Sequence, residues 1–187
     1  MKRIPTNKII ERTAFEMLCE NDITSIRTEE IVRNAGISKR TFYVYFKDKY
    51  DVCCQIYLHF QDVCWGVDDV RQNLPGFLER SSDILEGNKS NSAFLKNTML
   101  FKGQNCLSEY VVTCGVQNLE RLLVWNSRDD LLTTENKFLF EFYMRGMVSM
   151  SSSSSSYFKN LSLSRAGAFI YNYFPGELYD ALTRMPP

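Results

Sequence analysis

Residues 38–51, with the sequence S-K-R-T-F-Y-V-Y-F-K-D-K-Y-D, constrain the fold of this chain more than any other segment. They predict a helix from about Lys39 to Tyr45. A helix of this length needs support from the rest of the protein, because isolated helices shorter than about 12–15 residues are marginal in water. Phe42 and Phe46 share one side of it, and polar and aromatic side chains face the other way. We therefore expect the two phenylalanines to fix the helix to a core and leave its opposite side exposed.

A glycine-containing turn and a second helix come directly before this segment. Thr28 begins a predicted helix of about eight residues, Gly36 suits a tight turn, and Ser38 is a favoured residue for capping the next helix. A helix, a short turn and a second short helix together make a helix-turn-helix, in which the second helix enters the major groove of DNA.

The run T-E-E-I-V-R-N-A-G-I-S-K-R-T-F-Y-V-Y-F-K-D-K, residues 28–49, resembles the DNA-binding signature of the tetracycline-repressor (TetR) family of bacterial regulators. The resemblance covers residues 6 to about 52. Two positions differ from the commonest pattern of the family. Val32 stands where alanine is usual, at the packing of the two helices, and Arg40 stands where glycine is frequent, which adds a positive charge to the expected DNA-binding face.

Nine residues are the predicted DNA contacts. Arg40 can pair with O6 and N7 of guanine, and Val44 can touch a thymine methyl group. We expect hydroxyl groups and the Lys49 amine to bind phosphates and so to fix the register of the protein on DNA. The resemblance implies DNA contact for six of these positions. An ordinary solvated helix face is the alternative interpretation. The predicted set is Thr28, Ser38, Lys39, Arg40, Thr41, Tyr43, Val44, Tyr45 and Lys49.

The pattern of apolar residues predicts an all-α protein with two domains. A three-helix helix-turn-helix domain is expected over residues 1–47, and a helical effector-binding and dimerisation domain over residues 48–187. Residues 1–50 carry ten basic and seven acidic groups, a net charge of +3, whereas the remaining 137 residues carry −3. A basic DNA-reading domain on an acidic body fits this distribution. The predicted helices cover about 6–20, 28–35, 39–45, 48–67, 75–86, 92–102, 105–126, 134–157 and 163–174, followed by a last turn or two.

Ser149 and the run Ser151–Ser156 form a low-complexity segment after a strongly apolar stretch. We expect the helix to continue through these small residues, which would let another helix approach closely. A flexible linker is the alternative that the composition leaves open.

Composition excludes several other classes of protein. The net charge is zero, the six cysteines form no C-x-x-C pair, and the N-terminus has no apolar stretch of the kind that export requires. No run approaches the roughly 18 apolar residues of a membrane span, so we expect a cytoplasmic protein with no membrane partner. No nucleophile, base and orienting residue occur as a set, no phosphate-binding loop is present, and the single His59 has no metal-ligand spacing. We therefore predict no enzyme activity, no cofactor and no metal.

Two further features concern control and assembly. Six aromatic residues are candidates for an effector pocket, although plain core packing is the alternative for each of them: Trp65, Phe77, Phe94, Phe101, Tyr110 and Trp125. The helices at 134–157 and 163–174 hold more apolar surface than one small body can cover, which predicts a homodimer through these helices on a palindromic operator. The residues concerned are Phe138, Phe142, Met147, Phe169, Tyr171, Tyr173 and Phe174.

The principal hypothesis is a dimeric repressor that a small-molecule effector releases from DNA. The alternative is a regulator that lacks a small-molecule pocket, is controlled by a partner protein and activates transcription. The segments F-K-D-K-Y-D-V and R-G-M-V resemble a branch of the TetR family that includes regulators of dihydroxyacetone kinase operons. That resemblance implies that both control by a partner and activation are available to such a chain.

Overall fold

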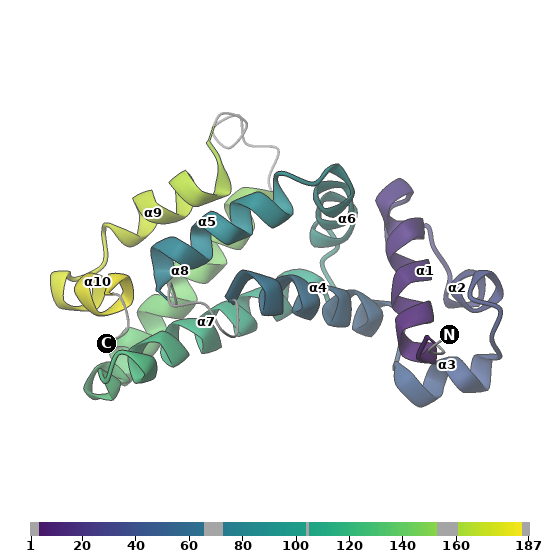
Figure 1. Ribbon diagram of the computed structural model, residues 1–187, viewed down its shortest axis with the longest axis horizontal. Helices are drawn as coiled ribbons and strands as arrows, with labels where there is room; N and C mark the ends of the chain where they lie inside the picture. Colours follow the sequence, from purple (N-terminus) through teal and green to yellow (C-terminus); the bar gives the residue numbers. More distant parts are fainter. Residues whose placement is uncertain (1–3, 66–72, 104, 153–160, 185–187) are drawn as a thin grey trace. The chain divides into compact units, whose positions relative to one another are not determined.

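The computed structural model describes residues 4–65, 73–103, 105–152 and 161–184, and every regular element in these ranges is helical (Figure 1). The predicted all-α fold is confirmed. Among the described residues no helix is both long and apolar enough to cross a membrane. The elements are α1 (Thr6–Glu20), α2 (Thr28–Asn34), α3 (Lys39–Tyr45), α4 (Lys49–Trp65), α5 (Leu74–Leu85), α6 (Lys89–Met99), α7 (Leu107–Trp125), the short 3-10 helix η1 (Asp129–Leu131), α8 (Thr134–Ser152), α9 (Leu163–Tyr171) and α10 (Gly176–Thr183).

The chain forms two compact units. The first comprises Met1–His59 with Lys89–Tyr110, and the second comprises Phe60–Asn88 with Val111–Pro187, so α4 and α7 each contribute residues to both. The first unit thus includes α6, which the predicted division at residues 47 and 48 places elsewhere. The assignment of separate functions to residues 1–47 and 48–187 stays a prediction.

Helices α1, α2 and α3 form the predicted three-helix helix-turn-helix around a common core. Ile10 and Ala14 of α1 lie one turn apart on one face, and both are fully buried. Ile31 of α2 and Phe42 of α3 are also fully buried. The turn between α2 and α3 contains Gly36 with φ +66°, a left-handed conformation that glycine adopts without strain. The local sequence signals for the motif therefore correspond to its observed geometry.

Helix α6 completes the first unit by closing on the end of α1, although 68 residues, 21–88, lie between the two helices along the chain. The Asn97 side-chain amide donates a hydrogen bond to the Leu18 carbonyl at 2.9 Å, and the Asn97 carbonyl accepts one from the Ile23 amide at 3.1 Å. The rings of Phe15 and Phe94 pack with their centroids 5.5 Å apart. Asn97 therefore satisfies a carbonyl that the end of α1 leaves without an intrahelical partner.

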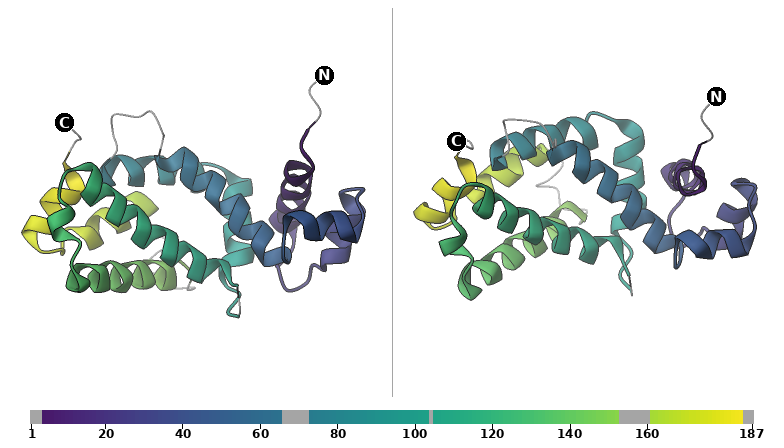
Figure 2. Two further views of the ribbon diagram at one scale, coloured as in Figure 1. Left: turned by 90° about the horizontal axis from the view of Figure 1, so that it is seen from below. Right: turned by 60° about the horizontal axis from the view of Figure 1, so that its bottom comes forward.

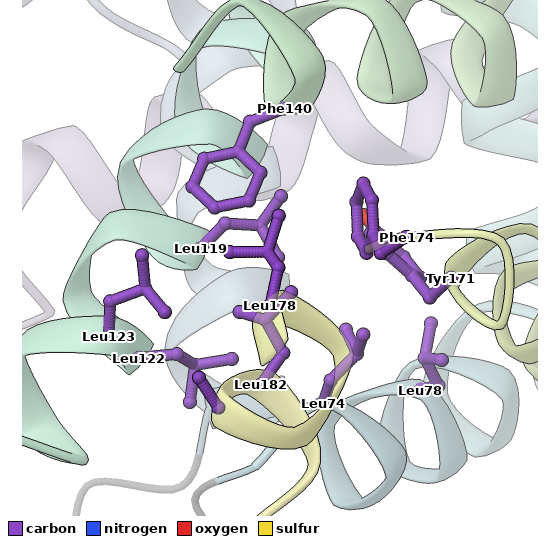
Figure 3. Close-up of a cluster of buried hydrophobic side chains, with 11 residues drawn as sticks. Leu74, Leu78, Leu119, Leu122, Leu123, Phe140, Tyr171, Phe174, Leu178 and Leu182 are labelled. Carbon is purple, nitrogen blue, oxygen red and sulfur yellow. The ribbon is translucent and has the colours of Figure 1, made fainter. Parts of the chain in front are cut away.

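The second unit is a helical bundle in which α5 packs along α9 and also contacts α10 (Figure 2). A Cβ atom at Gly167 would lie 2.6 Å from a Leu78 methyl group, so the close approach of α9 to α5 requires a glycine there. The main apolar core lies among α5, α7, α8, α9 and α10, as Figure 3 shows. Its buried residues are Leu74, Leu78, Leu119, Leu122, Leu123, Phe140, Tyr171, Phe174, Leu178, Ala181 and Leu182.

The expected course of the helix through the serine run is tested only at its start. Helix α8 continues through Ser149 and ends at Ser152. The rest of the run, residues 153–156, lies outside the described residues, and the expectation for it stays open.

Candidate nucleic-acid interface

Helix α3 has one buried side and one exposed side, as its sequence predicts. Phe42 and Phe46 are buried, with their ring centroids 5.8 Å apart. Tyr43, Val44 and Tyr45 are 57%, 71% and 47% exposed. Exposing three large apolar or aromatic side chains on a seven-residue helix to water is unfavourable. Such exposure is typical of a surface that contacts a partner.

The start of α3 is fixed by its own hydroxyl groups. The Ser38 Oγ accepts a hydrogen bond from the Thr41 amide at 3.0 Å and lies 2.8 Å from the Thr41 Oγ1. This cap satisfies an amide that the first turn cannot pair within the helix. Each hydroxyl keeps further hydrogen-bonding capacity, since a hydroxyl has one donor and two acceptor positions. The predicted phosphate contacts of Ser38, Thr41 and the half-buried Thr28 stay predictions.

Arg40 is exposed on α3 and, within the part of the chain that the structure describes, makes no ion pair or side-chain hydrogen bond. Its guanidinium presents five N–H donors in a planar fork that matches the two acceptors of guanine in the major groove. A base contact by Arg40 would therefore displace no interaction within the described structure.

Lys39 differs from Arg40, because it is paired with an acidic residue of α2. The Lys39 Nζ donates a hydrogen bond to the Glu29 Oε1 at 2.8 Å. This hydrogen bond raises the pKa of Lys39 and lowers the pKa of Glu29. Both groups are thus charged at neutral pH, and the sequence alone gave no reason to connect them.

Lys49 has a different environment from the one that its predicted phosphate contact suggests. Its ammonium group donates hydrogen bonds to the carbonyls of Ile23 at 2.5 Å and Ile26 at 2.6 Å. Burial lowers the pKa of Lys49. Two of its three N–H groups therefore hold the loop between α1 and α2, and one is left for any phosphate. The role of Lys49 at DNA stays a prediction.

The candidate effector residues lie in several separate environments. Phe94 is fully buried against Phe15, and Phe101 stacks on Tyr50 with centroids 4.6 Å apart; these lie in the first unit together with the half-buried Tyr110. In the second unit, Phe77 packs against the main core and Trp125 is 52% exposed. The Trp65 side chain lies outside the described residues. The assignment of these six residues to an effector site stays a prediction.

The buried cysteines and the single histidine have the following surroundings in the described residues. Cys53 and Cys54 are buried and are not in a disulfide, and burial raises the pKa of Cys53, which disfavours the reactive thiolate. The His59 Nε2 lies 2.9 Å from the Glu11 Oε2, beside Lys8, in a cluster between α4 and α1. No group of three or more potential metal ligands occurs in the described parts of the chain.

The fold and this surface define a helix-turn-helix DNA-binding protein. A comparison with protein-family models matches residues 10–53 to the bacterial regulatory proteins of the tetR family. The match spans α2, α3 and most of α1, so the helix-turn-helix of this chain is similar to that of the tetR family.

A solved structure similar to this chain is that of the dihydroxyacetone kinase operon activator DhaS. The TM-score is 0.60, and the sequences are 15% identical over 99% of this chain and 100% of that one. At this identity the similarity concerns the fold. A comparison with curated proteins finds no match.

Proposed function

We propose that this protein is a homodimeric, cytoplasmic transcriptional regulator whose two α3 helices read the half-sites of a palindromic operator. The exposed face of α3, with Arg40 available beside Tyr43, Val44 and Tyr45, is the observation that carries this proposal. One such helix contacts only a few base pairs. Two helices on half-sites about 34 Å apart, or slightly more, supply useful specificity.

Dimerisation is supported by exposed aromatic residues on α8 and directly around the end of α9. Phe138 and Phe142 lie one turn apart on α8, and Phe169 and Tyr173 have the same spacing; the four are 63–69% exposed. Exposed aromatic side chains at this spacing on a helix are typical of protein–protein contacts. Of the other residues expected there, Tyr171 and Phe174 belong to the core of the second unit and Met147 packs against it.

We propose repression that a small-molecule effector relieves as the mode of control. Activation under the control of a partner protein is the second candidate, and the similarity of the fold to a protein named as an operon activator favours it. Placing the operator next to a reporter promoter distinguishes the two. A repressor lowers reporter output when the protein is expressed, whereas an activator raises it.

Arg40→Ala should weaken binding to the specific operator by about 1–3 kcal/mol and leave binding to unrelated DNA nearly unchanged, because a bidentate contact to guanine is lost. The operator is first obtained by selecting bound fragments from random duplex DNA with the purified full-length protein. Affinities for this operator and for a scrambled duplex are then measured at one fixed salt concentration.

Arg33→Ala is the matched control for the loss of one arginine. Arg33 is exposed at the end of α2, in the same helix-turn-helix. The Arg33→Ala variant should have the same ratio of specific to nonspecific affinity as the wild-type protein. An equal loss on both duplexes for Arg40→Ala would show that this side chain only contacts phosphate.

A further inference from the structure

An acidic side chain lies directly beside two of the predicted DNA contacts of the helix-turn-helix. Glu29 is the second residue of α2, next to Thr28, and its carboxylate lies 2.8 Å from the Lys39 Nζ of α3. The Glu29 and Lys39 side chains are 56% and 61% exposed. A carboxylate is unfavourable beside DNA phosphates, so its presence on this face needs an explanation.

Stability of the fold explains little of it, although Glu29 lies in the first turn of α2, where a carboxylate interacts favourably with the helix dipole. Exposed ion pairs contribute little to folding, because water and salt screen them and both side chains lose conformational freedom. Helix α2 is capped independently, since the Glu30 Oε2 accepts a hydrogen bond from the Arg27 amide at 2.7 Å. The register of α3 is set by the buried Phe42 and the Ser38 cap. Removing the Glu29 charge should therefore leave the motif folded.

The ion pair of Glu29 with Lys39 changes the electrostatic attraction of this surface to DNA. Affinity for DNA of any sequence comes mainly from cations that neutralise phosphates and release counterions. A lysine already paired with a carboxylate contributes little to this release, because the pair is neutral as a whole. Lys39 is paired and Arg40 is not, so the face retains its means of reading a base while one of its phosphate-attracting charges is neutralised.

We propose that Glu29 suppresses nonspecific DNA binding by neutralising Lys39. This inference rests on the proposed function, since it assigns a role to a residue of the same DNA-binding surface. Genomic DNA offers a large excess of competing sites, and a regulator that binds them less tightly is more available to its operator.

The test is the salt dependence of binding to a scrambled duplex that lacks the operator. Glu29→Gln keeps the size of the side chain and one oxygen that can accept a hydrogen bond, and it removes the charge. Freed from Glu29, Lys39 should neutralise one more phosphate in each protomer. The slope of log affinity against log salt should steepen by about 0.9 per protomer, and nonspecific affinity at low salt should rise about threefold to tenfold.

Two further variants distinguish an effect of the Glu29–Lys39 pair from an effect of net charge alone. Glu29→Gln combined with Lys39→Gln should return the slope to nearly the wild-type value, because no additional cation is then available. Glu16→Gln is the matched control, since Glu16 is an exposed acidic residue of α1 whose partner Arg12 lies 3.8 Å away. It changes the net charge equally and should leave the slope unchanged.

Two results would overturn the role of Glu29: an unchanged slope for Glu29→Gln, or an equal steepening for Glu16→Gln. A wild-type protein that binds neither the scrambled duplex nor any fragment selected from random DNA would instead contradict the proposed function. The two failures are therefore distinguishable in the same set of measurements.

Discussion

Phe142→Glu should convert the protein from a dimer to a monomer and lower its affinity for a palindromic operator by about 10²–10⁴-fold. In the proposed symmetric interface each substitution occurs twice, so two carboxylates would be buried against apolar surface without a partner. A monomer also loses the high effective concentration that one bound half-site provides for the other. Sedimentation velocity measures the assembly, and titration with the selected operator measures the affinity.

Val63→Glu is the matched control for this experiment. Val63 is 60% exposed on α4, outside the proposed interface, and the change introduces the same charge at an exposed apolar position. The control variant should sediment as a dimer. Unchanged sedimentation of Phe142→Glu would place the interface on other elements.

Phe42→Ala should lower the free energy of unfolding by about 3–5 kcal/mol, because it removes a fully buried ring and leaves a cavity. The effect should be largest in the helix-turn-helix, since a seven-residue helix has little stability of its own once its anchor is lost. Denaturant titration gives the global change. Hydrogen exchange of the α3 amides shows whether this helix opens first.

The comparison for Phe42→Ala is Val44→Ala, two residues away on the same helix. Val44 is largely exposed, so its removal should change the free energy of unfolding by no more than about 0.5 kcal/mol. Similar losses for the two variants would mean that α3 is not held by the side that carries Phe42. Loss of DNA binding by Val44→Ala without loss of stability would instead support its predicted contact with a thymine methyl group.

The helix-turn-helix was predictable from sequence because its determinants are local. The Ser38 cap, the left-handed Gly36 and the spacing of Phe42 and Phe46 all lie within eleven residues, and each acts on the backbone or the helix face nearest to it. The bounds of α3 and its exposed side follow from these signals alone. The all-α fold is predictable for a similar reason, since helical periodicity persists along the chain.

The environments of individual polar groups were not predictable in this way. Lys49 appears from sequence as a free cation at a helix start, yet its ammonium group binds two carbonyls more than 20 residues earlier in the chain. Asn97 gives no sequence signal at all for its contact with the end of α1. The ion pair of Glu29 with Lys39 likewise requires α2 and α3 to meet at a particular angle.

Sequence by itself determined the helices, the recognition motif and the face of α3 that stays exposed, because those properties depend on residues within a few turns of one another. Only the tertiary structure decided which aromatic residues near the C-terminal end are core and which are surface. Tyr171 and Phe174 are buried, whereas Phe169 and Tyr173 remain exposed. Helical spacing places the buried pair and the exposed pair on different faces. Which face is buried depends on the distant helix that covers it, and this is a property of the packed chain.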